Sequence, residues 1–167
     1  MRISDSPSAP VKAVSITRVA AKLEGLRDAA NRYAAKTNHP PRAFLCNMGS
    51  LREYKARADF SRGFLAVAGF DVVYPEGFKS PEAAAGAFEK SGAGVAVICS
   101  VDDHYPALVP PLVQAIRACR PDATVVLAGY PQEQVETHKK SGVDEFLHIR
   151  ADAFELLAKL QSRLGIE

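Results

Sequence analysis

The sequence contains few cysteines, and they are not arranged as a metal site or a disulfide framework. Cys46, Cys99 and Cys119 are an odd number without metal-ligand spacing, and two of them lie in apolar runs of the 167-residue chain. Reduced, buried thiols are typical of proteins of the cytoplasm. We therefore expect a cytoplasmic protein that has no disulfide bonds.

Long hydrophobic segments are also missing. No run approaches the ~20 apolar residues that cross a bilayer. The first 18 residues, MRISDSPSAPVKAVSITR, lack the continuous apolar core of a signal peptide. We expect no membrane partner and no export signal.

The sequence also has no large excess of charge of one sign. The formal net charge is only +2, and the densest basic cluster is interrupted by Glu53 and Asp59. Its basic members are Arg52, Lys55, Arg57 and Arg62. Such mixed clusters are typical of solvated helix faces, so we expect no nucleic-acid partner.

Apolar runs and helical patterns alternate along most of the chain. Apolar runs predict strands at 43–48, 71–75, 94–100, 123–129 and 144–149, and helical spacing predicts helices at 56–69, 80–92, 105–120, 132–142 and 152–165. The prolines at 110 and 111 predict a late start or a kink in the third of these helices. The first, third and fourth runs are continuously apolar, as central parallel strands are.

This alternation predicts an α/β fold of the flavodoxin-like kind. Right-handed crossovers favour a doubly wound, five-stranded parallel sheet in the order 2-1-3-4-5, with 144–149 at an edge. An extra N-terminal helix precedes the sheet. We predict a flexible leader at 1–11, a linker helix at 12–41 and the flavodoxin-like domain at 42–167.

The predicted sheet places three loops at the carboxyl ends of its strands, where such folds bind ligands. We call the loops at 47–57, 100–106 and 128–132 the rim. Gly49 and Ser50 lack the spacing of a phosphate-binding loop, so we interpret Gly49 as a turn glycine. A flavodoxin-like nucleotide site at this turn is an alternative. The loop after the first strand also lacks the carboxylates that a phosphoacceptor receiver domain needs to bind magnesium.

The polar residues of the second rim loop match neither a metal site nor a catalytic triad. Asp102, Asp103 and His104 are adjacent and have no distant partner ligand, so we expect one of the aspartates to cap the next helix instead of holding a metal. Ser100, Asp102 and His104 lack a G-x-S-x-G nucleophile turn. The remaining histidines, His39, His138 and His148, are interpreted as surface residues.

Residues 42–167 resemble the C-terminal cobalamin-binding domain of the methylmalonyl-CoA mutase family. The resemblance is carried by FLCNMGSLREYKARADFSRGFLAVAGFDV, AVICSVDDHYPALVPPLVQAIR, VVLAGYP and GVDEFLHIRADAFELLAKLQSRLGI. The preceding LRDAANRYAAKT resembles the linker helix of that family. Cobalamin-binding members of that family carry D-x-H-x-x-G, S-x-L and Gly-Gly motifs, and the histidine of the first motif is the lower cobalt ligand.

The positions that match these motifs have changed. Ungapped counting places the Asp, His and Gly of the first motif on Arg52, Tyr54 and Arg57. It places S-x-L on Cys99, Ser100 and Val101, and Gly-Gly on Ala128 and Gly129. A tyrosine is a poor replacement for the imidazole ligand, and an arginine fills space that glycine leaves open.

The resemblance therefore implies a degenerate member similar to the small, non-catalytic subunit of the heterodimeric mutase. Such a chain would bind no cofactor, have no catalytic residues and support the large catalytic subunit, which isomerises methylmalonyl-CoA and succinyl-CoA. The alternative is an active adenosylcobalamin-binding domain. With the rim loop closed, we expect the helix after the first strand to begin near Ser50 or Leu51. Leu51, Tyr54 and Ala58 would then share one face, with Tyr54 turned into the vacated groove.

Overall fold

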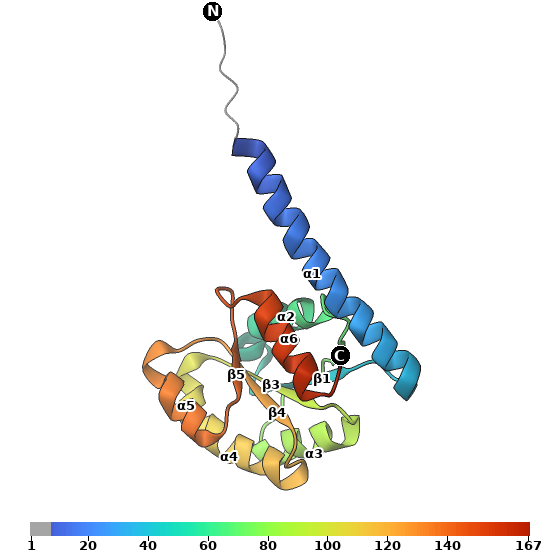
Figure 1. The fold of residues 1–167 in the computed structure, drawn as a ribbon. Helices are drawn as coiled ribbons and strands as arrows, with labels where there is room; N and C mark the ends of the chain where they lie inside the picture. The colour runs from blue at the N-terminus through green and yellow to red at the C-terminus, as the bar shows by residue number, and fades with distance from the viewer. Residues whose placement is uncertain (1–7) are drawn as a thin grey trace, which may run out of the picture.

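Five parallel strands form one sheet in the order β2-β1-β3-β4-β5 in the computed structural model, which describes residues 8–167 (Figure 1). The strands are β1 (Arg42–Asn47), β2 (Asp71–Val73), β3 (Val95–Cys99), β4 (Thr124–Ala128) and β5 (Glu145–Leu147). In register, Ala43 pairs with Val95 and Val95 with Thr124. The predicted fold class and strand order are confirmed, with β5 at an edge.

Helices cover both faces of the sheet (Figure 1). They are α1 (Ser8–Thr37), α2 (Leu51–Ala66), α3 (Pro81–Ser91), α4 (Tyr105–Cys119), α5 (Val135–Ser141) and α6 (Ala153–Arg163), with short 3-10 helices η1 (Asp102–His104) and η2 (Gln132–Gln134). Strand side chains alternate between two cores: Phe44 and Cys46 pack towards α3 and α4, whereas Ala43 and Leu45 pack towards α2 and α6. Cys46 and Cys99 are buried and unpaired, and they face opposite cores.

The helix α1 begins earlier than the sequence predicted. Residues 8–11, expected in the leader, are already helical, whereas 1–7 lie outside the described residues. The helix ends at Thr37 because Asn38 adopts a left-handed conformation with φ of 65°, a usual helix stop. Its C-terminal part packs through Leu26 and Ala30, and its N-terminal part extends away from the sheet (Figure 1).

A buried glutamine fixes α1 against the rest of the domain. The Gln161 side-chain amide on α6 donates to the backbone oxygens of Leu26, at 2.8 Å, and Ala68, at 3.1 Å. One side chain thus joins α1, the turn after α2 and α6. Although α1 is long, none of the helices in the described part of the chain is apolar enough to cross a membrane.

Two boundaries of the helices test sequence predictions directly. The helix α2 begins at Leu51, so the early start is confirmed. The helix α4 includes both Pro110 and Pro111 and begins at Tyr105, so a late start is wrong. Each proline removes only one backbone donor, and the apolar face formed by Val109, Leu112 and Ile116 remains buried.

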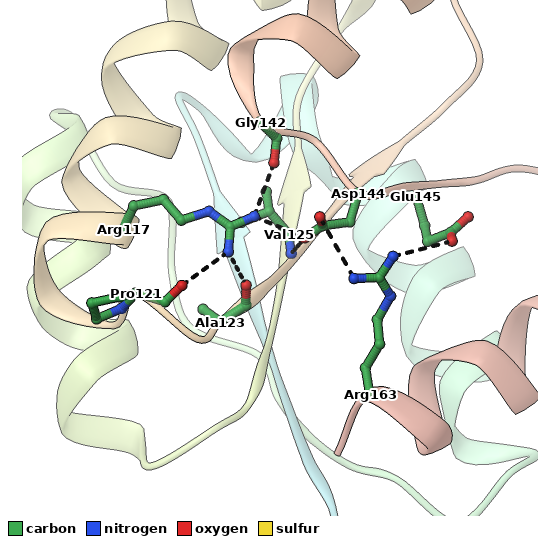
Figure 2. A network of polar contacts seen from close by, with 8 residues as sticks. All are labelled: Arg117, Pro121, Ala123, Val125, Gly142, Asp144, Glu145 and Arg163. Carbon is green, nitrogen blue, oxygen red and sulfur yellow. Dashed lines mark hydrogen bonds and ion pairs between the residues drawn. The ribbon is translucent and has the colours of Figure 1, made fainter. Parts of the chain in front are cut away.

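A polar network joins several elements at the amino ends of the strands (Figure 2). The Asp144 carboxylate, just before β5, accepts from Arg117 Nη2 at 2.9 Å and from the Val125 backbone N–H at 2.8 Å. Arg117 also donates to the backbone oxygens of Gly142 and Ala123, and Arg163 lies 3.7 Å from Asp144. These contacts position the short edge strand β5 against α4, β4 and α6.

Candidate functional site

The first rim loop turns directly into α2. Gly49 has a φ of +90°, which glycine adopts without strain, and the Ser50 backbone N–H donates to Glu53 Oε2 at 2.7 Å. That hydrogen bond from the Ser50 backbone lowers the pKa of Glu53. The local chemistry is that of a turn and a helix cap, as predicted for Gly49.

Arg57 on α2 is bonded to the second rim loop and lies beside the third. Its Nη1 lies 2.7 Å from Asp102 Oδ1 and 3.0 Å from the Ser100 backbone oxygen. A Cβ atom added to Gly129 would lie only 2.9 Å from the same nitrogen. The Arg57 guanidinium therefore fills the space between the ends of β3 and β4, where Gly129 leaves room for it.

The hydroxyl of Tyr105 ties together the backbones of the same two strands. It accepts from the Ser100 N–H at 3.0 Å and donates to the Ala128 oxygen at 2.7 Å. The Arg57 guanidinium lies 5.5 Å from the centroid of the Tyr105 ring, within cation–π range. Burial raises the pKa of Tyr105 above its ordinary value, so the hydroxyl keeps its proton near neutral pH.

His138 belongs to this end of the molecule and is not a surface residue. Only 1% of it is exposed, because α5 packs on α4 and places the ring edge-on to Tyr105, with centroids 6.1 Å apart. Its Nε2 lies 3.0 Å from Gln134 Oε1, whereas Nδ1 is buried without a partner. Burial lowers the pKa of His138. His148 is half-buried, and His39 is exposed, as predicted.

The aspartates of the second rim loop do not cap α4. The residue before that helix is His104, and no side chain caps it. Asp102 faces Arg57 instead, Asp103 is exposed, and His104 Nδ1 lies 3.8 Å from Glu53 Oε1. The ion pair with Arg57 on α2 positions the Asp102 side chain. Within residues 8–167 no group of three His, Cys, Asp or Glu side chains is placed to hold a metal ion.

The positions singled out in the sequence divide into two groups. Arg57, Ser100 and Gly129 meet at one place, with Ala128 buried beside them. Cys99 is buried beneath this place, and Val101 is half-buried beside it.

The other two positions of the altered first motif lie elsewhere. Arg52 is exposed on α2. Tyr54 is 4% exposed, and its Cε1 lies 2.7 Å from where a Cβ on Gly77 would be, so the ring packs against the segment after β2. Ala58 is buried on the same face as predicted, but Leu51 is largely exposed, so its predicted place on this face is wrong.

These side chains do not fit the cofactor that the resemblance implies. The position that counting matches to the histidine ligand carries the buried phenol of Tyr54, and the position matched to the motif glycine carries the Arg57 guanidinium, already bonded to Asp102 and Ser100. At the ends of β1 and β3 the backbone is paired, with Met48 N–H donating to the Cys99 oxygen at 3.0 Å. No imidazole stands at the aligned position to ligate cobalt.

A pocket of about 510 Å³ lies next to Arg57, between α2 and the loops after β4 and β5. It is lined by side chains from three separate segments, among them Arg57, Phe60, Tyr130, His148, Ile149 and Arg150. Sequence reasoning missed Phe60, Tyr130, Ile149 and Arg150 because nothing in the pattern of a single segment shows that α2 and these loops meet.

The chain is similar along nearly its whole length to part of a set of curated proteins. It is 32% identical over 161 residues, or 95% of the chain, to a protein of Mycobacterium tuberculosis named "Probable methylmalonyl-CoA mutase small subunit". It is 28% identical over 156 residues to the "Methylmalonyl-CoA mutase small subunit" of Porphyromonas gingivalis. The relatives of this chain are methylmalonyl-CoA mutase small subunits. The resemblance seen in the sequence is thus confirmed.

The match covers only part of each relative. The chain spans 25% of the Mycobacterium protein and 24% of the Porphyromonas protein. No family model matches the chain. The chain is therefore homologous to one segment of these small subunits.

Solved structures with the same fold are receiver-like proteins. A CheY-like protein (tadZ) from Pseudomonas aeruginosa superimposes with a TM-score of 0.58 at 22% identity, covering 76% of this chain and 95% of that one. A response regulator from Thermotoga maritima gives a TM-score of 0.54 at 15% identity, covering 75% and 98%. At these identities the similarity establishes the fold alone.

Proposed function

We propose that this chain is a degenerate cobalamin-fold domain of a methylmalonyl-CoA mutase small subunit that binds no cofactor and performs no chemistry. In this proposal it supports a large catalytic subunit, which isomerises methylmalonyl-CoA and succinyl-CoA, and the two form a heterodimer in the cytoplasm. The names of the relatives support the assignment to a small subunit. The roles of partner and substrate are inferences from the resemblance.

The position of Arg57 is the observation that carries the proposal. At the place of the motif glycine stands a cation held by Asp102 at 2.7 Å and by the Ser100 oxygen at 3.0 Å. A ligand entering between the ends of β3 and β4 would have to displace this guanidinium and leave Asp102 unpaired, which costs free energy. The protein's own side chain occupies the space that a cofactor would need.

Visible spectroscopy tests the proposal against the alternative of an active adenosylcobalamin-binding domain. The purified chain is mixed with adenosylcobalamin or hydroxocobalamin at micromolar concentration and then dialysed. We expect a colourless protein and an unchanged corrin spectrum. A stoichiometrically red protein after dialysis would contradict the proposal and establish the alternative.

A variant in which the cobalamin motif residues are restored serves as the positive control. Arg52→Asp, Tyr54→His, Arg57→Gly and Ala128→Gly together restore the motif positions, and the matched control omits Tyr54→His. We expect only the fourfold variant to show an imidazole-ligated spectrum, with affinity about 10–100-fold below a native site for each supporting contact that is missing. A folded fourfold variant with no spectral change at millimolar cobalamin would show that the sheet packing, not only the rim, excludes the cofactor.

The partner is tested separately by co-expression with a large mutase subunit. We expect the two chains to co-purify, and mutase activity of the complex to be insensitive to Arg57→Gln in this chain. Failure to co-purify would contradict the supporting role without affecting the cobalamin result.

A further inference from the structure

The pocket beside Arg57 gathers exposed apolar side chains. Three of its lining residues are large, apolar and exposed: Phe60 at 40%, Tyr130 at 46% and Ile149 at 85%. They come from α2, from the loop after β4 and from the loop after β5, so only the fold brings them together. Exposed apolar side chains that surround a concave surface are characteristic of binding sites, whereas single ones are ordinary.

The polar lining of the same pocket carries positive charge. Two arginines, Arg57 and Arg150, line it together with Gln132 and His148, and no carboxylate is among its described lining residues. Asp102 contacts Nη1 of Arg57, and the guanidinium has further N–H donors. The concavity therefore favours an anionic group.

Two stacked aromatic rings belong to the wall of the pocket. Tyr130 and His148 stack with centroids 4.7 Å apart and planes 30° from parallel. The His148 Nδ1 accepts from the Arg150 backbone N–H at 3.3 Å, and burial lowers the pKa of His148 below its ordinary value. The imidazole is accordingly neutral near pH 7, and the stack adds aromatic rings to a wall that Arg57 and Arg150 also line.

We propose that this pocket binds a small molecule consisting of a flat aromatic ring that bears one anionic group, a carboxylate or a phosphate. The ring would lie against Tyr130 and Phe60, and the anion would be bound by Arg150 and by N–H donors of Arg57 other than those facing Asp102 and Ser100. Its volume of about 510 Å³ is ordinary for a small-molecule site. The inference does not rest on the proposed function, because neither cobalt nor a corrin ring takes part in it.

Four simple probes test the chemistry. Benzoate and phenyl phosphate supply the two anions, and benzamide and phenol are their neutral counterparts. Each is titrated into the ¹⁵N-labelled chain, with the backbone amides of Gly129 and Ile149 as reporters. We expect both anions to give saturable shifts with a Kd at least about tenfold below that of the neutral partner. The tighter anion identifies carboxylates or phosphates as the natural class.

Variants locate the site. Arg150→Gln should weaken both anions about tenfold and leave benzamide unchanged, and Tyr130→Ala should weaken all four probes. Arg18→Gln, an exposed arginine on α1, is the matched control and should change nothing. The proposal is overturned if benzoate and benzamide bind equally, if neither pocket variant changes the affinities, or if no shift saturates below about 10 mM.

Discussion

The two ends of the sheet each contain an arginine paired with an aspartate, but the pairs do different things. At the amino ends, Arg117 and Asp144 contact α4, β4, the α5–β5 loop and α6 (Figure 2). At the carboxyl ends, Arg57 and Asp102 join α2 to the loop after β3, next to an open pocket. The first pair holds the edge of the fold together, whereas the second lies at the carboxyl ends of the strands, where open α/β sheets bind ligands.

The comparison predicts that the Arg117–Asp144 network contributes more stability than any polar group of the rim. Asp144→Ala removes a charged acceptor from Arg117 and from the Val125 N–H. We expect a loss of about 3 kcal/mol in the free energy of unfolding, because the partly buried guanidinium and the backbone donor both lose their acceptor. Urea denaturation measures this. Glu136→Ala, which removes an exposed carboxylate 3.7 Å from Lys139, is the control and should change little.

Tyr105→Phe tests the strongest uncharged link at the rim. The change leaves the Ala128 oxygen and the Ser100 N–H without their bond to the hydroxyl. We expect a loss of about 1–2 kcal/mol, since each buried backbone group then lacks a partner. Thermal or urea unfolding gives the value, with Tyr130→Phe as a control on an exposed ring. If Tyr105→Phe lowered the free energy of unfolding as much as Asp144→Ala does, the two ends of the sheet would contribute equally to stability, which would contradict the comparison.

Arg57→Gly should have a smaller effect on stability but a local effect on the rim. The Arg57 side chain is about one-third exposed, so its pair with Asp102 is screened, and we expect about 1 kcal/mol or less. Hydrogen exchange at Gly129 and at Asp102 should become faster, while exchange at Val125 at the opposite end stays unchanged. Uniform acceleration across the sheet would show instead that Arg57 supports the whole fold.

The smallest expected effect is a pH dependence that arises at the rim end. In the folded chain, burial lowers the pKa of His138 and His148 below the ordinary 6.5, so below that pH the unfolded chain binds more protons. The stability they contribute is complete above pH 6.5 and falls as the pH is lowered towards 5. Denaturation midpoints at pH 7.5, 6 and 5 measure this. His138→Gln should flatten the decrease, and an unchanged slope would assign it to other groups.

The fold was predictable because local patterns and global packing agree. Continuous apolar runs at 43–48, 94–100 and 123–129 became the buried central strands, and Ser80 followed by Pro81 began α3 as those residue types do. The early start of α2 was expected from a closed rim loop, and in the structure the Ser50 N–H bond to Glu53 accompanies it. The predicted starts of α1 and α4 were wrong. The N-terminal Ser–Pro stretch and Pro110–Pro111 predicted later starts, but the surrounding residues form helix in spite of them.

The candidate site was predicted only in part. Motif counting identified Arg57, Ser100 and Gly129, which do meet. It gave no sign that Asp102 pairs with Arg57, because the two are 45 positions apart and oppose each other only after β1 and β3 align. His138 was misplaced for the same reason: seven residues of a polar helix do not reveal that one ring packs on Tyr105 of α4.

The sequence by itself determined the order and type of the elements, the parallel sheet, the resemblance to a mutase small subunit and which residues stand at the positions matched to the cobalamin motifs. These depend on residue types and spacings within single segments. Tertiary structure alone decided that Arg57 turns towards Asp102 and Ser100, that His138 is buried, and that Phe60, Tyr130 and Ile149 surround one pocket. The reason is physical, since burial and ion pairing depend on neighbours that only the folded sheet and its helices bring within a few ångströms.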